Sequence, residues 1–263
     1  MKRSRYPSGL LLWPWLLLLL SSGACDSSRA AEGHLTIAAA ASTRFAIEAL
    51  CHDFEQRSNI RITIITGSSG KLTAQIREGA PYDLFISADE QYPISLRGQN
   101  RTVGPPEAFA NGSLVLWSVS LDTTVALSDL RNDTVLRHLA IANPATAPYG
   151  RAAMEVLQKA APEAATTNKL VYGESIAQVN QFISSGAAEA GFTALSVVLA
   201  PGMKQLGWFT RVNDSLHAPI VHAAVVIQTG NKEREATARS FLRYLHSEES
   251  GKILRRFGYT LPG

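Results

Sequence analysis

Short apolar segments alternate with amphipathic segments along the first half of the chain. The spacing of apolar residues predicts strands at 35–41, 60–65 and 83–87, and helices at 43–57, 70–78 and 90–96. Short strands that alternate with amphipathic helices are typical of a parallel sheet with helices on both faces. This half of the chain therefore predicts an α/β unit.

The same alternation returns after Gly104-Pro105-Pro106. It predicts strands at 114–119, 139–142, 170–172, 190–193 and 220–227, and helices at 151–161, 176–185, 232–246 and 250–257. We predict an α/β fold with two lobes, each a mostly parallel sheet flanked by helices. Residues 34–112 and 219–263 form lobe I, residues 113–218 form lobe II, and two crossing strands join them.

The N-terminal residues are expected to lie outside this fold. Lys2, Arg3 and Arg5 precede an apolar run at 10–20 that is shorter than the roughly 20 residues of a membrane span. Residues 1–24 therefore read as a signal peptide, followed by a polar tether at 25–33.

Two sites are candidates for cleavage of the signal. Ser22-Gly23-Ala24-Cys25 resembles a lipoprotein signal, in which Cys25 would be acylated. An ordinary signal peptidase could instead cut after Ala30-Ala31. If Cys25 carries lipid, Cys51 is left without a partner, and we expect no internal disulfide.

The overall charge argues against a nucleic-acid surface. The chain has 25 basic and 22 acidic side chains, and cleavage before Cys25 would remove Lys2, Arg3 and Arg5 and balance the two signs. The six histidines show no paired ligand spacing, so no metal centre is predicted. No pair of carboxylates indicates a general acid and base.

Serines stand at three junctions between a predicted strand and a predicted helix. The junctions are Ser42-Thr43, Gly67-Ser68-Ser69-Gly70-Lys71 and Glu174-Ser175-Ile176. A helix start presents unpaired N–H groups and a partial positive charge, so it attracts anions. The carboxyl ends of the strands in open α/β sheets border the ligand cleft. The alternative for each serine is a simple helix cap.

The stretch 67–71 partly matches two other motifs. A phosphate-binding nucleotide loop fails, because Ile65 replaces its first glycine and Leu72 its magnesium-binding hydroxyl. Ser68-x-x-Lys71 matches the motif of penicillin-recognising serine hydrolases, with Ser68 as nucleophile. The companion stretches Ser128-Asp129-Leu130 and Gln228-Thr229-Gly230 each differ at one position from that family's motifs. An exported serine hydrolase is the second hypothesis.

Several longer stretches resemble one family, the periplasmic molybdate-binding proteins of ATP-driven importers. They are LTIAAAAS at 35–42, GSSGKLTAQ at 67–75, EGAPYDLFISAD at 78–89, IANPATAPYG at 141–150 and RFGYT at 256–260. The resemblance spans about residues 34–260. It implies the two-lobed periplasmic-binding-protein fold and a binding protein rather than an enzyme.

The resemblance also implies the ligand and the partners. The lobes would close on molybdate or tungstate, with molybdenum present only as the oxyanion and no cofactor. The permease and ATPase subunits of a membrane importer would be the partners, and the protein would be a monomer outside the cytoplasmic membrane. The implied donors are the hydroxyls of Ser42 and Ser69 and the backbone N–H groups of Tyr149 and Ile176.

The chain departs from the family at one implied donor. Many members carry a tyrosine where this chain has Ala194, so that hydroxyl is absent. The phenol of Tyr149 or the hydroxyl of Thr43 could replace it. Alternatively, Tyr149 faces solvent or covers the cleft as a lid. Of the serine pair, the resemblance directs Ser69 rather than Ser68 into the cleft.

Overall fold

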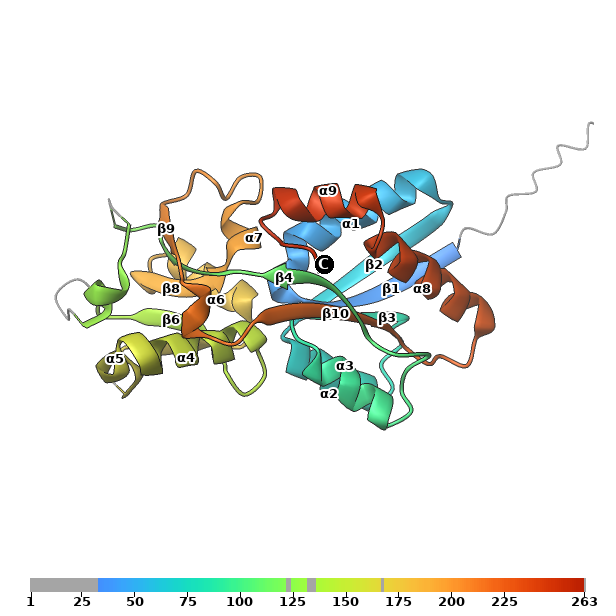
Figure 1. Ribbon diagram of the computed structural model, residues 1–263, viewed down its shortest axis with the longest axis horizontal. Coiled ribbons are helices and arrows are strands. Elements are labelled where there is room, and N and C mark those ends of the chain that lie inside the picture. Colours follow the sequence, from blue (N-terminus) through green and yellow to red (C-terminus); the bar gives the residue numbers. More distant parts are fainter. Residues whose placement is uncertain (1–32, 122–123, 132–135, 167, 263) are drawn as a thin grey trace, which may run out of the picture. The chain divides into compact units, whose positions relative to one another are not determined.

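The computed structural model describes residues 33–121, 124–131, 136–166 and 168–262. The predicted signal peptide, Cys25 and all but the last residue of the predicted tether lie outside these residues. The described chain contains two five-stranded sheets (Figure 1). None of its described helices is long and apolar enough to cross a membrane.

The first sheet has the strand order β2-β1-β3-β10-β4. Strand β1 pairs in parallel with β2 and β3, whereas β10 is antiparallel to both β3 and β4. Only β10 therefore runs against the others. The bounds are β1 Gly33–Ala40, β2 Ile60–Gly67, β3 Leu84–Ser87, β4 Glu107–Gly112 and β10 Ile220–Val226.

The second sheet repeats this pattern with the order β7-β6-β8-β5-β9. Strand β6 pairs in parallel with β7 and β8, and β5 is antiparallel to β8 and β9. Each sheet is thus mixed but mostly parallel. The bounds are β5 Leu114–Ser118, β6 Leu139–Ala142, β7 Leu170–Gly173, β8 Ala190–Ala194 and β9 Trp208–Arg211.

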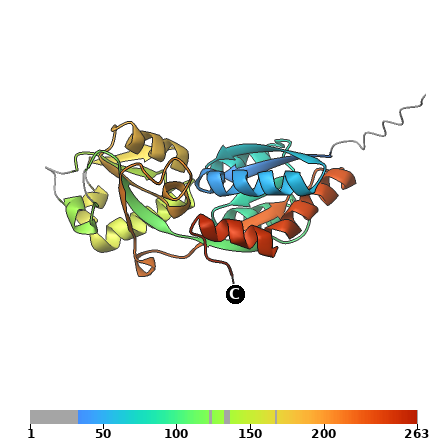
Figure 2. The same cartoon turned by 90° about the horizontal axis from the view of Figure 1, so that it is seen from above.

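Helices cover both faces of each sheet. Helices α1, α8 and α9 pack on one face of the first sheet, and α2 and α3 cover the other (Figures 1 and 2). On the second sheet α4 and α6 take opposite faces, as right-handed crossovers in opposite directions require. The bounds are α1 Arg44–Arg57, α2 Ser69–Arg77, α3 Gln91–Gly98, α4 Pro148–Ala160, α5 Pro162–Thr166, α6 Ile176–Ser184, α7 Leu195–Val198, α8 Lys232–Leu245 and α9 Glu248–Arg256.

The chain passes between the sheets at the ends of β4 and β5. Strand β4 ends at Gly112, and β5 begins at Leu114 in the other sheet. The return follows β9 and enters β10, whose first residue Ile220 pairs with Gly112. Because β10 is antiparallel to β3, both passages lie at the edge where β1, β2 and β3 end.

The predicted fold class is confirmed, and the differences concern short or exposed elements. The sequence pattern missed β4, β9, α5 and α7. Strand β4 contains a single large apolar residue, Phe109, and the edge strand β9 exposes Trp208. Helix α4 begins at Pro148 rather than at the predicted Arg151, because proline fits the first turn of a helix. Tyr149 therefore lies inside the helix and not in a loop.

Cys51 lies buried in α1 as a free cysteine. Burial raises the pKa of its thiol, so the reactive thiolate is disfavoured. The buried core around it carries the stability of the described fold without a disulfide at this position.

A buried carboxylate ties the first sheet to α8. Asp83 is 1% exposed, and its two oxygens accept from the N–H of Thr36 and from Nε of Arg234, both at 2.7 Å. These contacts hold β1, the start of β3 and α8 together. Asp83 therefore has a structural role in the fold.

We expect Asp83→Ala to lower the free energy of unfolding by about 1–3 kcal/mol, because the N–H of Thr36 and the guanidinium of Arg234 would both lose their acceptor. Urea unfolding would measure the change. The matched control is Glu48→Ala, which removes an exposed pair with Arg44 within α1 and should cost at most about 0.5 kcal/mol. Equal losses in both variants would contradict this role of Asp83.

Candidate oxyanion site

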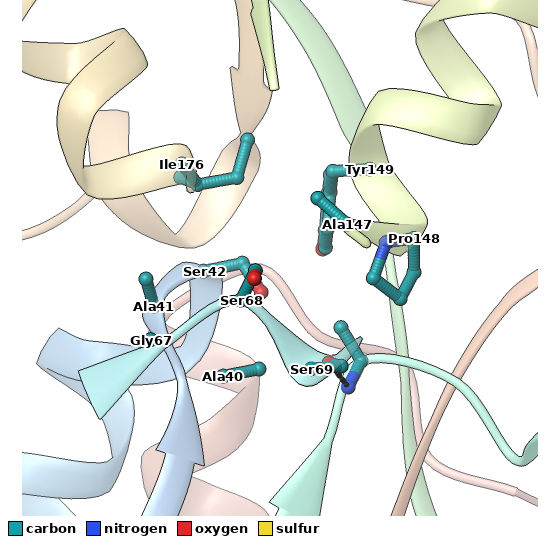
Figure 3. A pocket seen from close by; sticks show the side chains of 11 residues that line it. Ala40, Ala41, Ser42, Gly67, Ser68, Ser69, Ala147, Pro148, Tyr149 and Ile176 are labelled. Atoms are coloured by element: carbon teal, nitrogen blue, oxygen red, sulfur yellow. Dashed lines mark hydrogen bonds between the residues drawn. The ribbon is translucent and has the colours of Figure 1, made fainter. Parts of the chain in front are cut away.

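Residues from both sheets line one cavity where strands end and helices begin. The free space inside it is small, about 10 Å³, far below the roughly 300–1,000 Å³ of sites for organic ligands. Figure 3 shows the lining side chains. They belong to Ala40, Ala41, Ser42, Gly67, Ser68, Ser69, Ala88, Ala147, Pro148, Tyr149 and Ile176.

Four predicted ligand residues, Ser42, Ser69, Tyr149 and Ile176, lie together at this cavity. Ser42 follows β1 in the short 3-10 helix η1 (Ala41–Thr43). Ser69 and Ile176 are the first residues of α2 and α6, and Tyr149 is the second residue of α4. Backbone N–H groups in a first helical turn have no partner within the helix. Three helix starts from two sheets therefore offer free donors at one place.

The end of β3 orients the hydroxyl of Ser69. The N–H of Ala88 donates to Ser69 Oγ at 3.1 Å, and Ser69 is fully buried. This contact uses one lone pair of the hydroxyl oxygen and leaves its proton free. Ser69 can therefore donate to an acceptor in the cavity.

Thr43 lies apart from the other candidates. Its hydroxyl donates to the carbonyl oxygen of Ala40 at 2.7 Å, and its side chain is not among the lining residues. A hydroxyl has only one proton to donate. The structure therefore does not support Thr43 as the replacement for the missing family hydroxyl.

The phenol of Tyr149 has a partner inside the protein. Its oxygen lies 3.3 Å from Nε2 of His222 on β10, and the residue is only 2% exposed. The alternative that Tyr149 faces solvent is therefore wrong. Burial raises the pKa of this phenol well above its usual value, so it stays neutral. Donation of this hydroxyl to an oxyanion stays a prediction.

The junction serines do not cap their helices, contrary to the simpler expectation. Ser68 and Ser175 are the N-cap residues of α2 and α6, and neither side chain makes a capping hydrogen bond. Ser175 also lies outside the cavity lining. In α1 the N-cap Thr43 likewise makes no capping bond through its side chain.

Ala194 contributes no side chain to the cavity. It is fully buried at the N-cap of α7 and is not a lining residue. The described residues contain no group of three or more histidine, cysteine or acidic side chains that could hold a metal ion. The residues that line the cavity all have neutral side chains.

Charged side chains near the cavity are paired across the two sheets. Lys71 Nζ in α2 pairs with Glu174, which precedes α6. Arg151 in α4 pairs with Asp89, which follows β3. The pairing of Lys71 with Glu174 contradicts the serine hydrolase hypothesis, because a Ser-x-x-Lys enzyme needs this lysine beside its serine. Ser68 Oγ has no hydrogen-bond partner among the described residues.

The two sides of the cavity also meet through the backbone. The N–H of Gly70 in α2 donates to the carbonyl oxygen of Thr146 at 2.9 Å. The hydroxyl of Tyr92 in α3 donates to the carbonyl oxygen of Ala145 at 3.2 Å. A Cβ on Gly70 would lie 3.0 Å from the backbone of Thr146. Glycine therefore permits this close approach.

His222 makes stability depend on pH. It is fully buried between Tyr149, Phe109 and Tyr259, and burial lowers its pKa from 6.5 to about 3. Below pH 6.5 this histidine binds a proton in the unfolded chain but stays neutral in the folded protein. The stabilisation by neutral His222 is therefore complete above pH 6.5 and is lost progressively as the pH falls towards 3.

We expect the free energy of unfolding to fall by about 1.4 kcal/mol per pH unit from this residue between about pH 6 and 4. In His222→Gln this part of the pH dependence should disappear, whereas the exposed control His52→Gln should keep it. Denaturant unfolding at several pH values would measure it. The same slope in wild type and His222→Gln would exclude His222 as the cause.

Comparison with known proteins agrees with this geometry. The family model described as bacterial extracellular solute-binding protein matches residues 35–260. The molybdate-binding protein ModA of Azotobacter vinelandii is 36% identical over 94% of this chain and 97% of its own length. ModA of Rhodobacter capsulatus is 36% identical over 88% of this chain and 90% of its own length.

A solved structure shows the same arrangement of elements. The periplasmic molybdate-binding protein of Azotobacter vinelandii superposes with a TM-score of 0.80 at 31% sequence identity, covering 87% of this chain and 100% of that structure. The family match and the identity over most of both chains confirm the resemblance predicted from the sequence. The chain belongs to the bacterial extracellular solute-binding protein family.

Proposed function

We propose that the protein captures molybdate, and tungstate in the same way, in the cavity between the sheets. One observation carries this proposal: three helix starts and three serines meet in a small cavity whose lining has no charged side chain. The donors would be the hydroxyls of Ser42 and Ser69 and the N–H groups of Tyr149 and Ile176. The homologous molybdate-binding proteins support this ligand.

Neutral donors select a fully deprotonated dianion. Two carbonyl oxygens beside the cavity already accept from protein hydroxyls, Ala40 from Thr43 and Ser42 from Ser196. A protonated oxyanion such as hydrogen phosphate would bring an O–H that finds few acceptors. An unpaired buried polar group costs about 1–3 kcal/mol, so the cavity would favour molybdate over phosphate.

Size would decide between oxyanions of equal charge. Molybdate, tungstate and sulfate are all tetrahedral dianions, and the same donors can serve each. We expect tungstate to bind like molybdate, since the two ions are nearly equal in size. The smaller sulfate would leave donors at longer distances.

The two sheets would belong to lobes that close on the ligand, with residues 34–112 and 219–263 in one lobe and 113–218 in the other. The contacts of Gly70 with Thr146 and of Arg151 with Asp89 cross the cavity and would hold the closed form. The closed protein would deliver the ion to the permease and ATPase subunits of an importer, outside the cytoplasmic membrane. We expect a monomer, anchored by lipid if Cys25 is acylated.

We expect molybdate and tungstate to raise the melting temperature of the purified protein and phosphate to leave it unchanged. A ligand that binds only the folded state at a hundred times its Kd adds about 2.7 kcal/mol, or about 5–10 °C for a protein of this size. Differential scanning calorimetry would measure the shift. No shift with either oxyanion would disprove the proposed ligand, and an equal shift with phosphate would disprove selection by neutral donors.

Closure should be sensitive to any side chain at Gly70. We expect Gly70→Ala to weaken molybdate binding by about 1–3 kcal/mol, the usual cost of overpacking, because the added Cβ would lie 2.7 Å from the hydroxyl of Tyr92 and 3.0 Å from the backbone of Thr146 across the cavity. The melting temperature without ligand should stay or rise, since alanine favours helix α2. Calorimetric titration would give the affinity. The control is Gly98→Ala, in which the new Cβ meets no atom within 4 Å, so this variant should bind molybdate as tightly as wild type. A weaker affinity of Gly98→Ala would contradict this interpretation.

A further inference from the structure

Ser68 carries a buried hydroxyl without a partner. Five buried side-chain polar atoms of the described residues have no hydrogen-bond partner, and only Ser68 Oγ belongs to the cavity lining. The other four atoms belong to His217, His222, Ser250 and Tyr259. Ser68 is 4% exposed, and Figure 3 shows its hydroxyl pointing into the same part of the cavity as that of Ser42. A buried hydroxyl without a hydrogen-bond partner is costly. A ligand in the cavity would supply that partner.

The usual local role of this hydroxyl is not used. Ser68 is the N-cap residue of α2 with extended backbone angles, φ −69° and ψ 148°. An N-cap hydroxyl normally accepts from the N–H of the second or third helical residue. Here the N–H of the second residue, Gly70, donates to Thr146 across the cavity instead. The N–H of Gly70 is therefore not available to a capping hydroxyl of Ser68.

Two other hydroxyls near the cavity, those of Thr43 and Tyr149, already have a partner within the protein. Thr43 donates to Ala40, and the phenol of Tyr149 lies beside His222. The hydroxyl of Ser69 accepts from Ala88 and keeps its proton free. Among the serines that line the cavity, three hydroxyl protons therefore remain for a ligand that can only accept, those of Ser42, Ser68 and Ser69.

We propose that Ser68 donates its hydroxyl proton directly to the bound oxyanion, as a third side-chain donor beside Ser42 and Ser69. This inference rests on the proposed function of the cavity. It revises the expectation that only Ser69 of the serine pair faces the ligand. Ser68 then supplies the hydroxyl that Ala194 cannot provide.

The test is calorimetric titration with molybdate of wild type, Ser68→Ala and Ser175→Ala. We expect Ser68→Ala to raise the Kd about 10- to 150-fold, the effect of losing a hydrogen bond to a charged group. Its melting temperature without ligand should stay or rise, because a methyl group replaces an unpaired hydroxyl. Ser175 is the matched control: it is an N-cap serine without a capping bond that lies outside the cavity, and its variant should keep the wild-type Kd.

A second variant, Ser68→Gly, separates ligand contact from helix capping. Glycine replaces serine at an N-cap at a cost of only a few tenths of a kcal/mol, so it should show the same loss of affinity as Ser68→Ala. If wild type binds molybdate and both Ser68 variants bind it as tightly as wild type does, this inference is wrong while the proposed function stands. A loss of affinity matched by a lower melting temperature without ligand would also overturn it, since capping would explain both. A wild-type protein that binds no oxyanion would overturn the proposed function itself.

Discussion

Backbone N–H groups at the start of a helix have no partner within that helix, and this constraint organises the cavity. Helices α2, α4 and α6 all begin there. Their unpaired N–H groups and aligned peptide dipoles place partial positive charge at one point without a cationic side chain. A buried dianion must regain the hydrogen bonds that it loses with its water shell. The proposed ligand and the unpaired donors would thus satisfy each other.

The topology of the sheets brings these helix starts together. Parallel strands that precede helices end at the same edge of a sheet, and β4 carries the chain from that edge of the first sheet directly into β5 of the second. Hydroxyls beside the cavity then occupy backbone acceptors: Thr43 donates to Ala40, and Ser196 donates to Ser42. The space is left with an excess of donors.

Tyr149 connects the cavity to the passage between the sheets. Its backbone lies in the first turn of α4 at the cavity, while its hydroxyl lies beside His222 on β10. A Cβ on Gly112, the last residue of β4, would lie 2.2 Å from this hydroxyl and 2.7 Å from His222 Nε2. Glycine is therefore the residue that fits at this crossing. The passage and the cavity share one side chain, so a change in either should affect both.

The amino-acid pattern was sufficient for the α/β class, most strands and helices, and the serine junctions, because these depend on local periodicity and turn chemistry. Four predicted ligand residues, Ser42, Ser69, Tyr149 and Ile176, do lie at one cavity, although their ligand role is a proposal. The exposed edge strand β9 and the short helix α7 gave no periodic signal. The state of each hydroxyl could not be read from the sequence either. Tyr149 lies beside His222 from a strand 73 residues further along the chain. Ser68 lacks a partner, and the N–H of Gly70, which it could cap, donates instead to Thr146 on the other side of the cavity. These contacts join residues far apart in the chain, so only the tertiary structure decides them.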